Sequence, residues 1–134
     1  KMYIIIYNNE TMLPMYTAEK SHDVTLDFFK DRGEHCFESE NGNIINKYVK
    51  DESLLDRKSF GYERNYDVSN QLVLNDVPEG TTIFLDNVEQ GILESTEDLE
   101  IDFEEVGTYE LKLVNIPEYL DSIITVKVGN EVTS

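Results

Sequence analysis

The neighbouring residues His35 and Cys36 are the first candidates for chemistry, because an imidazole beside a thiol can activate it as a nucleophile. They fall within Glu34–Glu38, a run typical of a β-strand, where neighbouring side chains point to opposite faces. We therefore predict that Cys36 is a buried, unreactive core residue and that His35 is exposed. The other histidine, His22, lies at an expected helix start, where a capping role suits its position better than catalysis.

Carboxylates are the most numerous candidate ligands, and Asp98, Glu100 and Asp102 form a spaced acidic row that Glu104 follows. A calcium site needs several converging oxygens, whereas residues two apart on a strand lie roughly 6.5 to 7 Å apart and diverge. We expect a solvated acidic face and no metal or cofactor. The single cysteine, Cys36, excludes an internal disulfide and a cysteine-based zinc site.

Tyrosine is the more informative residue type, with eight tyrosines in 134 residues and no tryptophan. A ring with a polar tip suits protein interfaces, and it equally suits small half-buried sheets, so both interpretations stay open. Five tyrosines in or beside the first half are the candidate partner-binding residues: Tyr3, Tyr7, Tyr48, Tyr62 and Tyr66.

The charge is large and uneven. The chain carries a formal net charge of −17. Residues 1–70 hold 13 acids and 9 bases, a net of −4, while residues 71–134 hold 15 acids and only Lys112 and Lys127, a net of −13. Such asymmetry indicates two units. It also argues against direct nucleic-acid binding, because phosphates would be repelled.

Composition excludes other classes. Hydrophobic residues make up 40% of the chain and aromatic residues 10%. The sequence is therefore too apolar for a disordered acidic tail. No stretch approaches the roughly 20 apolar residues of a membrane span. Tyr3–Tyr7 is too short for the apolar core of a signal peptide, so we expect neither a membrane segment nor a secretory signal.

We expect residues 71–134 to be mainly β, as an antiparallel β-sandwich. Asp98–Phe103 alternates between acidic and apolar residues, and Gly107–Leu113 repeats the alternation. The apolar positions should face the core, so Phe103, Tyr109 and Leu111 are predicted to be buried. The other expected strands and turns are Gln71–Leu74, the turn Val77–Gly80, Thr81–Leu85, the hairpin turn Asp86–Asn87, Val88–Glu89 and Ile123–Val128.

The first half, residues 1–70, is expected to be a small α+β subdomain that serves assembly. Its core of roughly 65 residues is near the lower limit for independent stability, so it should lean on a partner. We place the boundary in the polar segment Asn65–Asn70. The expected order is β-β-α-β-β, with strands Met2–Tyr7, Met12–Thr17, Glu34–Glu38 and Ile44–Val49 and a helix over Val24–Arg32. Pro14 makes the second strand an edge. The helix should be capped by Ser21 or Asp23 and ended by Gly33.

Several short motifs carry a family resemblance. They are Val77–Val88, Phe103–Leu113, Ile116–Leu120, Gly33–Glu38 and Tyr48–Asp51. With its Pro-x-Gly-Thr turn, the second half resembles the small β-sandwich shared by PEGA-like (Ig-like) surface domains and by the C-terminal half of small tail-associated proteins of tailed bacteriophages. In the phage proteins a region similar to residues 1–70 precedes this half. The resemblance implies no catalytic residues.

The sequence thus favours a non-enzymatic structural protein of a phage virion. It would be a tail or tail-fibre component or accessory, made in the host cytoplasm and oligomeric within an assembly of other virion proteins. We expect the main contact in residues 1–70, at strand edges near Met2–Tyr7 or Ile44–Val49. The alternative is an acidic inhibitor that mimics nucleic acid and blocks a host defence protein. A small hydrolase is a third, weaker interpretation.

Overall fold

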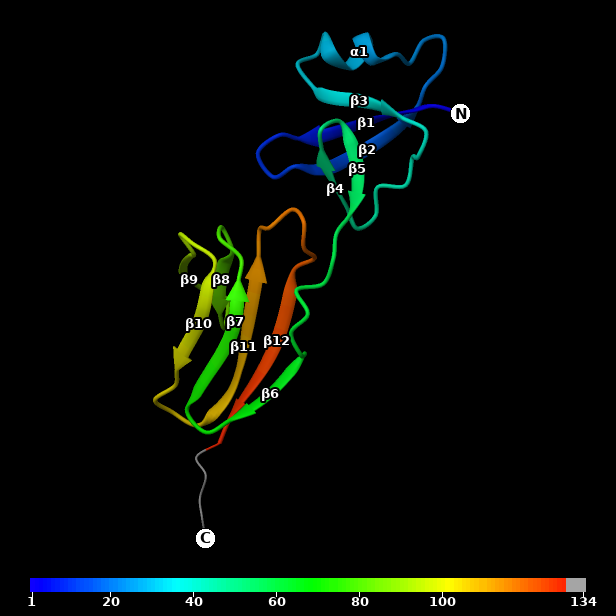
Figure 1. The fold of residues 1–134 in the computed structure, drawn as a ribbon. Helices are drawn as coiled ribbons and strands as arrows, with labels where there is room; N and C mark the ends of the chain where they lie inside the picture. Colours follow the sequence, from blue (N-terminus) through cyan, green and yellow to red (C-terminus); the bar gives the residue numbers. More distant parts are fainter. Residues whose placement is uncertain (130–134) are drawn as a thin grey trace. The chain divides into compact units, whose positions relative to one another are not determined.

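In a computed structural model, residues 1–129 are described as twelve strands and one short helix (Figure 1). The fold is mainly β, as the sequence predicted. The chain divides into two compact units. Unit 1 holds Lys1–Lys58 with Pro117–Tyr119, and unit 2 holds Ser59–Ile116 with the chain from Leu120 onward. The elements are β1 (Tyr3–Asn8), β2 (Leu13–Glu19), α1 (Leu26–Lys30), β3 (His35–Ser39), β4 (Lys47–Lys50), β5 (Ser53–Asp56), β6 (Asn65–Val68), β7 (Gln71–Val77), β8 (Thr82–Leu85), β9 (Val88–Ile92), β10 (Glu97–Asp102), β11 (Gly107–Val114) and β12 (Ser122–Val128).

Unit 1 is built on a three-stranded antiparallel sheet in the order β2-β1-β3. The middle strand carries three consecutive isoleucines because both faces of this sheet are covered. Ile4 and Ile6 pack with Phe29 of α1 on one face. Ile5 packs with Val49 of β4 on the other. Burial on both faces therefore explains why this strand is apolar throughout rather than alternating.

The position of β1 corrects one expectation. Because β1 pairs with β2 on one side and β3 on the other, the strand near Met2–Tyr7 has no free edge. The run with Pro14 is an edge strand, as predicted. Ile6 pairs with Tyr16 and Tyr7 with Pro14, so Met15 is left out of the pairing as a bulge. A proline and a bulge are common ways to protect an edge from unwanted pairing.

Helix α1 is shorter than expected and begins later. Its N-cap is Thr25, whose Oγ1 accepts a hydrogen bond from the backbone N–H of Phe28 at 3.2 Å, and neither Ser21 nor Asp23 serves. The hydroxyl of Ser21 accepts instead from the N–H of Val24 at 3.1 Å, which makes a separate turn before the helix. The helix ends at Lys30, three residues before Gly33.

A hairpin of β4 and β5 replaces the single strand expected over Ile44–Val49. Its turn is formed by Asp51 and Glu52, both with positive φ, 50° and 55°. This is the backbone of a two-residue hairpin turn, but Asn and Gly are the usual signals for it. Sequence reasoning missed the hairpin because Asp51 is followed by Glu52, whereas the usual signal has Gly or Asn at that second position.

The chain segment between β11 and β12 contributes to unit 1. Lys58 pairs with Tyr119 in an isolated parallel bridge, and its N–H donates to the carbonyl of Glu118 at 2.9 Å. The Nε of Arg57 donates to the carbonyl of Pro117 at 2.9 Å. Unit 1 is therefore completed by residues that lie about 60 positions further along the sequence.

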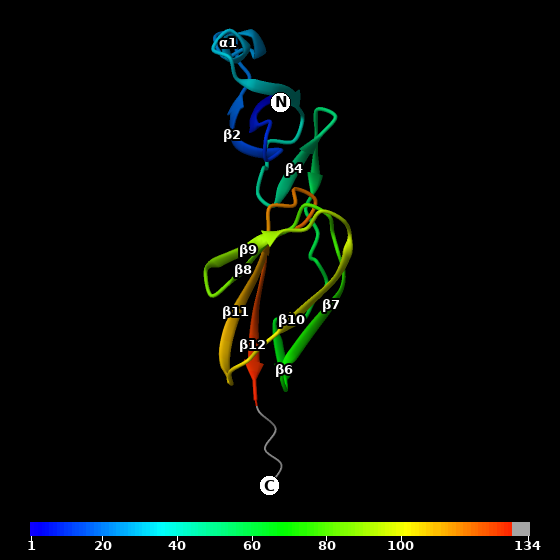
Figure 2. The ribbon, with the colours of Figure 1, turned by 90° about the vertical axis from the view of Figure 1, so that its left-hand side faces the viewer.

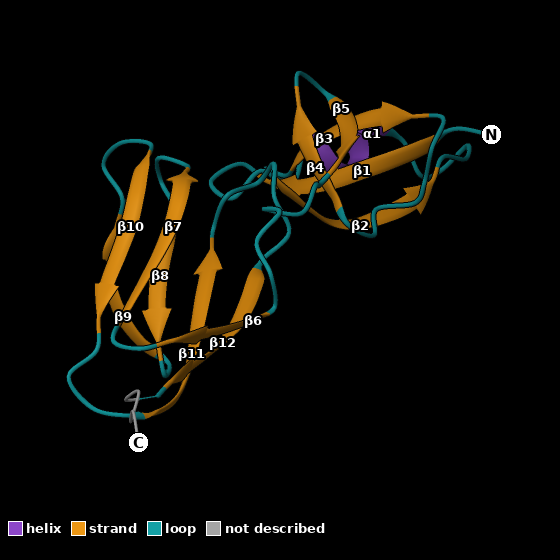
Figure 3. Ribbon diagram, turned by 60° about the horizontal axis from the view of Figure 1, so that its bottom comes forward, coloured by secondary structure: helices purple, strands orange, loops and turns teal. Residues whose placement is uncertain are grey.

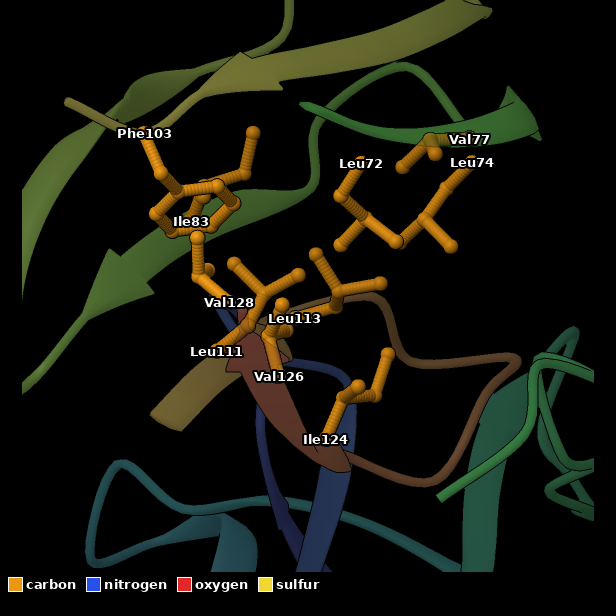
Figure 4. Close-up of a cluster of buried hydrophobic side chains, with 10 residues drawn as sticks. All are labelled: Leu72, Leu74, Val77, Ile83, Phe103, Leu111, Leu113, Ile124, Val126 and Val128. Carbon is orange, nitrogen blue, oxygen red and sulfur yellow. The ribbon is translucent and has the colours of Figure 1, made fainter. Parts of the chain in front are cut away.

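Unit 2 contains a five-stranded sheet in the order β6-β12-β11-β8-β9 and a two-stranded sheet of β7 and β10 (Figure 2). Side chains from both sheets share one buried cluster, in which Leu72 and Leu74 point toward Ile124 (Figure 4). Leu111 is fully buried and Phe103 is 8% exposed, as predicted, while Tyr109 is half-buried. The strand register expected for β11 is thus confirmed.

Strand β6 occupies most of the segment expected to be a linker. It pairs in parallel with β12, so that Tyr66 lies beside Val126 and Val68 beside Val128. The division between the units accordingly falls after Lys58, earlier than the expected boundary after Asn70. The segment looked like a linker because alternate residues are polar, yet this is the pattern of a strand with one face in water.

The turn chemistry read from residues 71–90 agrees with the structure. Asp86 and Asn87 have φ of 50° and 66° and join β8 to β9 as a two-residue hairpin, as predicted. Asp86 is fixed by two bonds to Glu110, in which its N–H donates to the carbonyl and its Oδ1 accepts from the N–H, each at 2.8 Å. Gly80, with φ of 91°, closes the predicted turn after Pro78.

Candidate interaction surfaces

The structure separates the two residues of the potential cysteine–histidine pair. Cys36 is 7% exposed and lies in the cluster of Ile4, Ile6 and Phe29 beneath α1. Its Sγ lies 3.9 Å from the carbonyl oxygen of Leu26. Burial raises the pKa of the Cys36 thiol above its ordinary value. His35 is exposed on β3, so the two side chains follow the strand alternation that the sequence predicts.

The acidic row on β10 is exposed, as predicted, while the intervening apolar residues are half-buried. Asp98 accepts a hydrogen bond from the N–H of Asp76 at 3.0 Å, and Asp102 accepts from Nε2 of Gln71 at 2.9 Å. The carboxylate of Glu100 makes no ion pair within residues 1–129, while its backbone pairs with Val73 of β7. Over the same residues, no three acidic, histidine or cysteine side chains gather in a way that could hold a metal ion.

The five candidate tyrosines are distributed over both units, and all are half-buried. Tyr3 and Tyr7 pack against the unit 1 cluster that contains Ile5. Tyr62 and Tyr66 pack against the core of unit 2. The structure therefore does not gather these tyrosines into one surface within a unit, and it gives four of them a packing role. Their use in partner binding stays a prediction.

The hydroxyl groups of Tyr62 and Tyr66 bond within unit 2, whereas Tyr48 lies on the outer side of a hairpin in unit 1. The hydroxyl of Tyr62 donates to the carbonyl of Asn75 at 2.6 Å, and the hydroxyl of Tyr66 accepts from the N–H of Glu63 at 3.0 Å. Tyr48 on β4 lies opposite Leu55 on β5, which is 40% exposed. Since the next pair of the hairpin faces the unit 1 core, this pair lies on the outer side.

A second exposed apolar surface lies on the outer face of the five-stranded sheet, opposite the core cluster. Its apolar members include Phe84, Ile92 and Ile123, of which Ile92 is 60% and Ile123 is 56% exposed. Lys112 pairs with both Phe84 and Ile123 in neighbouring strands, so the three side chains lie in one row. Lys127 projects from the same face. We call this surface the outer face.

Sequence reasoning did not single out the outer face, although the signal was present. The buried positions of β12 alternate as Ile124, Val126 and Val128, which leaves Ile123 on the opposite side. Lys112 and Lys127 are the only basic residues after Gln71, and both lie on this face. Two signals could have indicated the outer face. One is an isoleucine on the water-facing side of a regular strand, and the other is the presence of both basic residues on that same side.

The outer surface of the β7–β10 sheet has the opposite character. Apart from Val73, which is 43% exposed, its projecting residues are polar or acidic, with the β10 row dominating. The nitrogen of Lys112 on the outer face lies 3.6 Å from Glu110 Oε1 and 2.9 Å from Asn87 Oδ1, so that face mixes both signs of charge. Unit 2 therefore presents one mixed, partly apolar face and one acidic face.

Comparison of the chain with protein-family models, with curated proteins and with solved structures finds no match in any of the three. Within the described range, no helix has the length and apolar character needed to cross a membrane.

Proposed function

We propose that this is a non-enzymatic structural and interaction protein of a phage virion, a component or accessory of the tail or its fibres that acts through protein–protein contacts. The observation that carries the proposal is the outer face of unit 2. Exposed Ile92 and Ile123 with charged residues around them form a surface of the kind that proteins use for binding. In this proposal the protein is made in the host cytoplasm and oligomerises within the assembly.

We further propose that unit 2 is an Ig-like β-sandwich related to PEGA-like domains. Two observations support this. The order β12-β11-β8-β9, with β7 beside β10, corresponds to the G-F-C-C′ and B-E strands of immunoglobulin domains. The hydroxyl of Tyr109, near the start of β11, donates to the carbonyl of Glu105 at 2.8 Å. This is the position and the bond of the tyrosine corner of that fold.

We propose that unit 1 is the small α+β subdomain that serves assembly. Packing of α1 on one face of the β2-β1-β3 sheet supports an α+β description. For the contact itself we propose the hairpin pair Tyr48 and Leu55 within unit 1, because it joins a candidate tyrosine to an apolar residue that is 40% exposed, and the free edge of β2 is protected. The outer face of unit 2 and this pair are thus the two surfaces to compare.

Virion composition tests the proposal first. Mass spectrometry of purified particles should recover the protein in a fixed ratio to the other tail proteins. If it is missing from particles and instead co-purifies with a basic host defence protein, the proposal fails and the nucleic-acid mimic takes its place.

Three matched variants then locate the contact, each placing a carboxylate on an exposed strand position. Ile123→Glu alters the outer face, Leu55→Glu alters the hairpin, and Val73→Glu is the control on the acidic sheet. We expect Ile123→Glu to lower incorporation into particles at least tenfold and Val73→Glu to leave it unchanged. A loss confined to Leu55→Glu would assign the contact to unit 1, as the sequence suggested.

A further inference from the structure

Unit 2 has an apolar groove lined by residues of β8, β9 and β10. Strands β9 and β10 are edge strands of its two sheets and lie on the same side of the unit (Figure 3). The groove has a volume of about 370 Å³. Its apolar lining comes from both sheets, with Ile83 and Leu85 from β8 and Leu99 and Ile101 from β10. The two β10 side chains face the core but are only half-buried. The core of unit 2 is therefore incompletely covered on this side.

Strand β10 has a pairing edge along the groove that no described strand occupies, because β10 pairs only with β7. Its register with β7 is regular from Leu99 to Asp102. In an antiparallel pair, alternate backbone N–H and C=O groups point away from the partner strand. Such an edge is a template on which an extended segment of another chain can add as a further strand.

The facing edge, β9, is a poorer template. Ile83 pairs with Gly91 and Phe84 with Glu89, so Gln90 is left out as a bulge. Gly91 has φ of 139°, which distorts the strand at the same place. Bulged edges resist strand addition. Of the two edges that border the groove, β10 is the one suited to accept a strand.

The side chains of β10 define the chemistry of the segment that would fit. Leu99 and Ile101 face the groove, so the added strand needs apolar residues at the positions that point inward. Asp98, Glu100 and Asp102 face outward, so its alternate residues should be Lys or Arg. A second copy of β10 would place carboxylates against carboxylates, and nucleic acid would bring phosphates to them, so both are disfavoured.

We propose that β10 accepts an extended segment of another protein, about five residues long, in which apolar residues alternate with Lys or Arg. The added strand extends the β7–β10 sheet, covers the groove with its apolar residues and pairs its cationic residues with the acidic row. This surface belongs to unit 2 and meets the outer face at Ile92, which lines the groove from β9. The proposed strand addition rests on β10, which is not part of the outer face, so the inference goes beyond the proposed virion role and does not depend on it.

Peptide binding to the full chain tests this inference. The probe is a fluorescently labelled seven-residue peptide in which Lys alternates with Val or Ile. A peptide of the same composition with the lysines in one block controls for charge attraction alone. The readouts are fluorescence anisotropy and amide hydrogen exchange across Leu99–Phe103. We expect the alternating peptide to bind and to slow exchange of β10 amides, because strand addition pairs them.

Two charge-reversal variants complete the test. Glu100→Lys lies in the regular part of β10, and Glu89→Lys is the matched exposed glutamate on β9. We expect Glu100→Lys to weaken binding of the alternating peptide about tenfold, while Glu89→Lys changes it less than twofold. The proposal is overturned if the alternating peptide does not bind or if the block peptide binds equally well. It is also overturned if Glu100→Lys has no effect on binding or if Glu89→Lys has the larger effect.

Discussion

Replacing Tyr109 by Phe should weaken unit 2 by about 1 kcal/mol. The change removes one hydroxyl, which donates to the carbonyl of Glu105 at 2.8 Å. The ring remains and keeps its contact with Phe103, at 4.7 Å between ring centroids, so the packing contribution is retained. Because Glu105 is exposed, water can replace the lost donor, and the cost stays near that of one net hydrogen bond. About 1 kcal/mol corresponds to roughly a fivefold change in the folding equilibrium.

Hydrogen exchange can measure this effect separately in each unit. Amides of β11 and β12 in the Tyr109→Phe protein should exchange about fivefold faster, while those of Ile4–Ile6 should not change. Tyr16→Phe is the control, because Tyr16 is 42% exposed and lies on β2 in unit 1. Unchanged amide exchange rates in unit 2 would refute the contribution of the Tyr109–Glu105 hydrogen bond to stability. A loss above about 3 kcal/mol would show that more than the hydroxyl had been disturbed.

Three further predictions concern the core, the thiol and the unit boundary. Leu111→Ala should cost about 2–5 kcal/mol in denaturant unfolding, because Leu111 is fully buried; a cost below 1 kcal/mol would contradict the packing. Cys36 should react with a thiol reagent only on unfolding, since burial raises the pKa of its thiol above the ordinary value. Rapid labelling of the native protein would disprove this. The thiol of the unfolded chain ionises first, so the free energy of unfolding should fall as the pH rises through the ordinary thiol pKa of about 8.5; a constant value there would contradict the raised pKa. A fragment of residues 59–134 should be more stable by circular dichroism than one of 71–134, which lacks β6; equal stabilities would contradict the boundary after Lys58.

Alternation and turn chemistry carried most of the successful predictions. The faces of β10 and β11 follow from a period of two, because each of these strands has one side in water and one in the core. The hairpin at Asp86–Asn87 follows because Asn and Asp tolerate positive φ. Where strand alternation or turn preference agrees with the tertiary environment, the local sequence is sufficient to predict the structure.

The errors arose where partners distant in sequence decide the structure. Strand β6 is held by β12, about 60 residues away, and a short polar run carries no sign of that pairing. The central place of β1 likewise depends on β3, since a hairpin with β2 alone would leave it an edge. Thr25 was overlooked as a helix cap because Ser21 and Asp23 are equally good capping residues by type.

The candidate surfaces were less predictable than the fold. Tyr48 and Tyr66 have the same residue type, yet one lies on the outer side of a hairpin and the other packs against a core. Composition cannot distinguish these roles. The groove beside β10 depends on which strands two separate sheets leave unpaired, and local sequence does not record that.

The parallel pairing of β6 with β12 has a consequence for synthesis of the protein. Asn65 must wait for Thr125 to be made, a separation of 60 residues. At about 5–20 residues per second, the wait is roughly 3 to 12 seconds. Lys58 of unit 1 waits just as long for Tyr119. During translation the nascent chain therefore carries two unfinished units with unpaired strands, and this interval is when a chaperone or an assembly partner would have the easiest access to them.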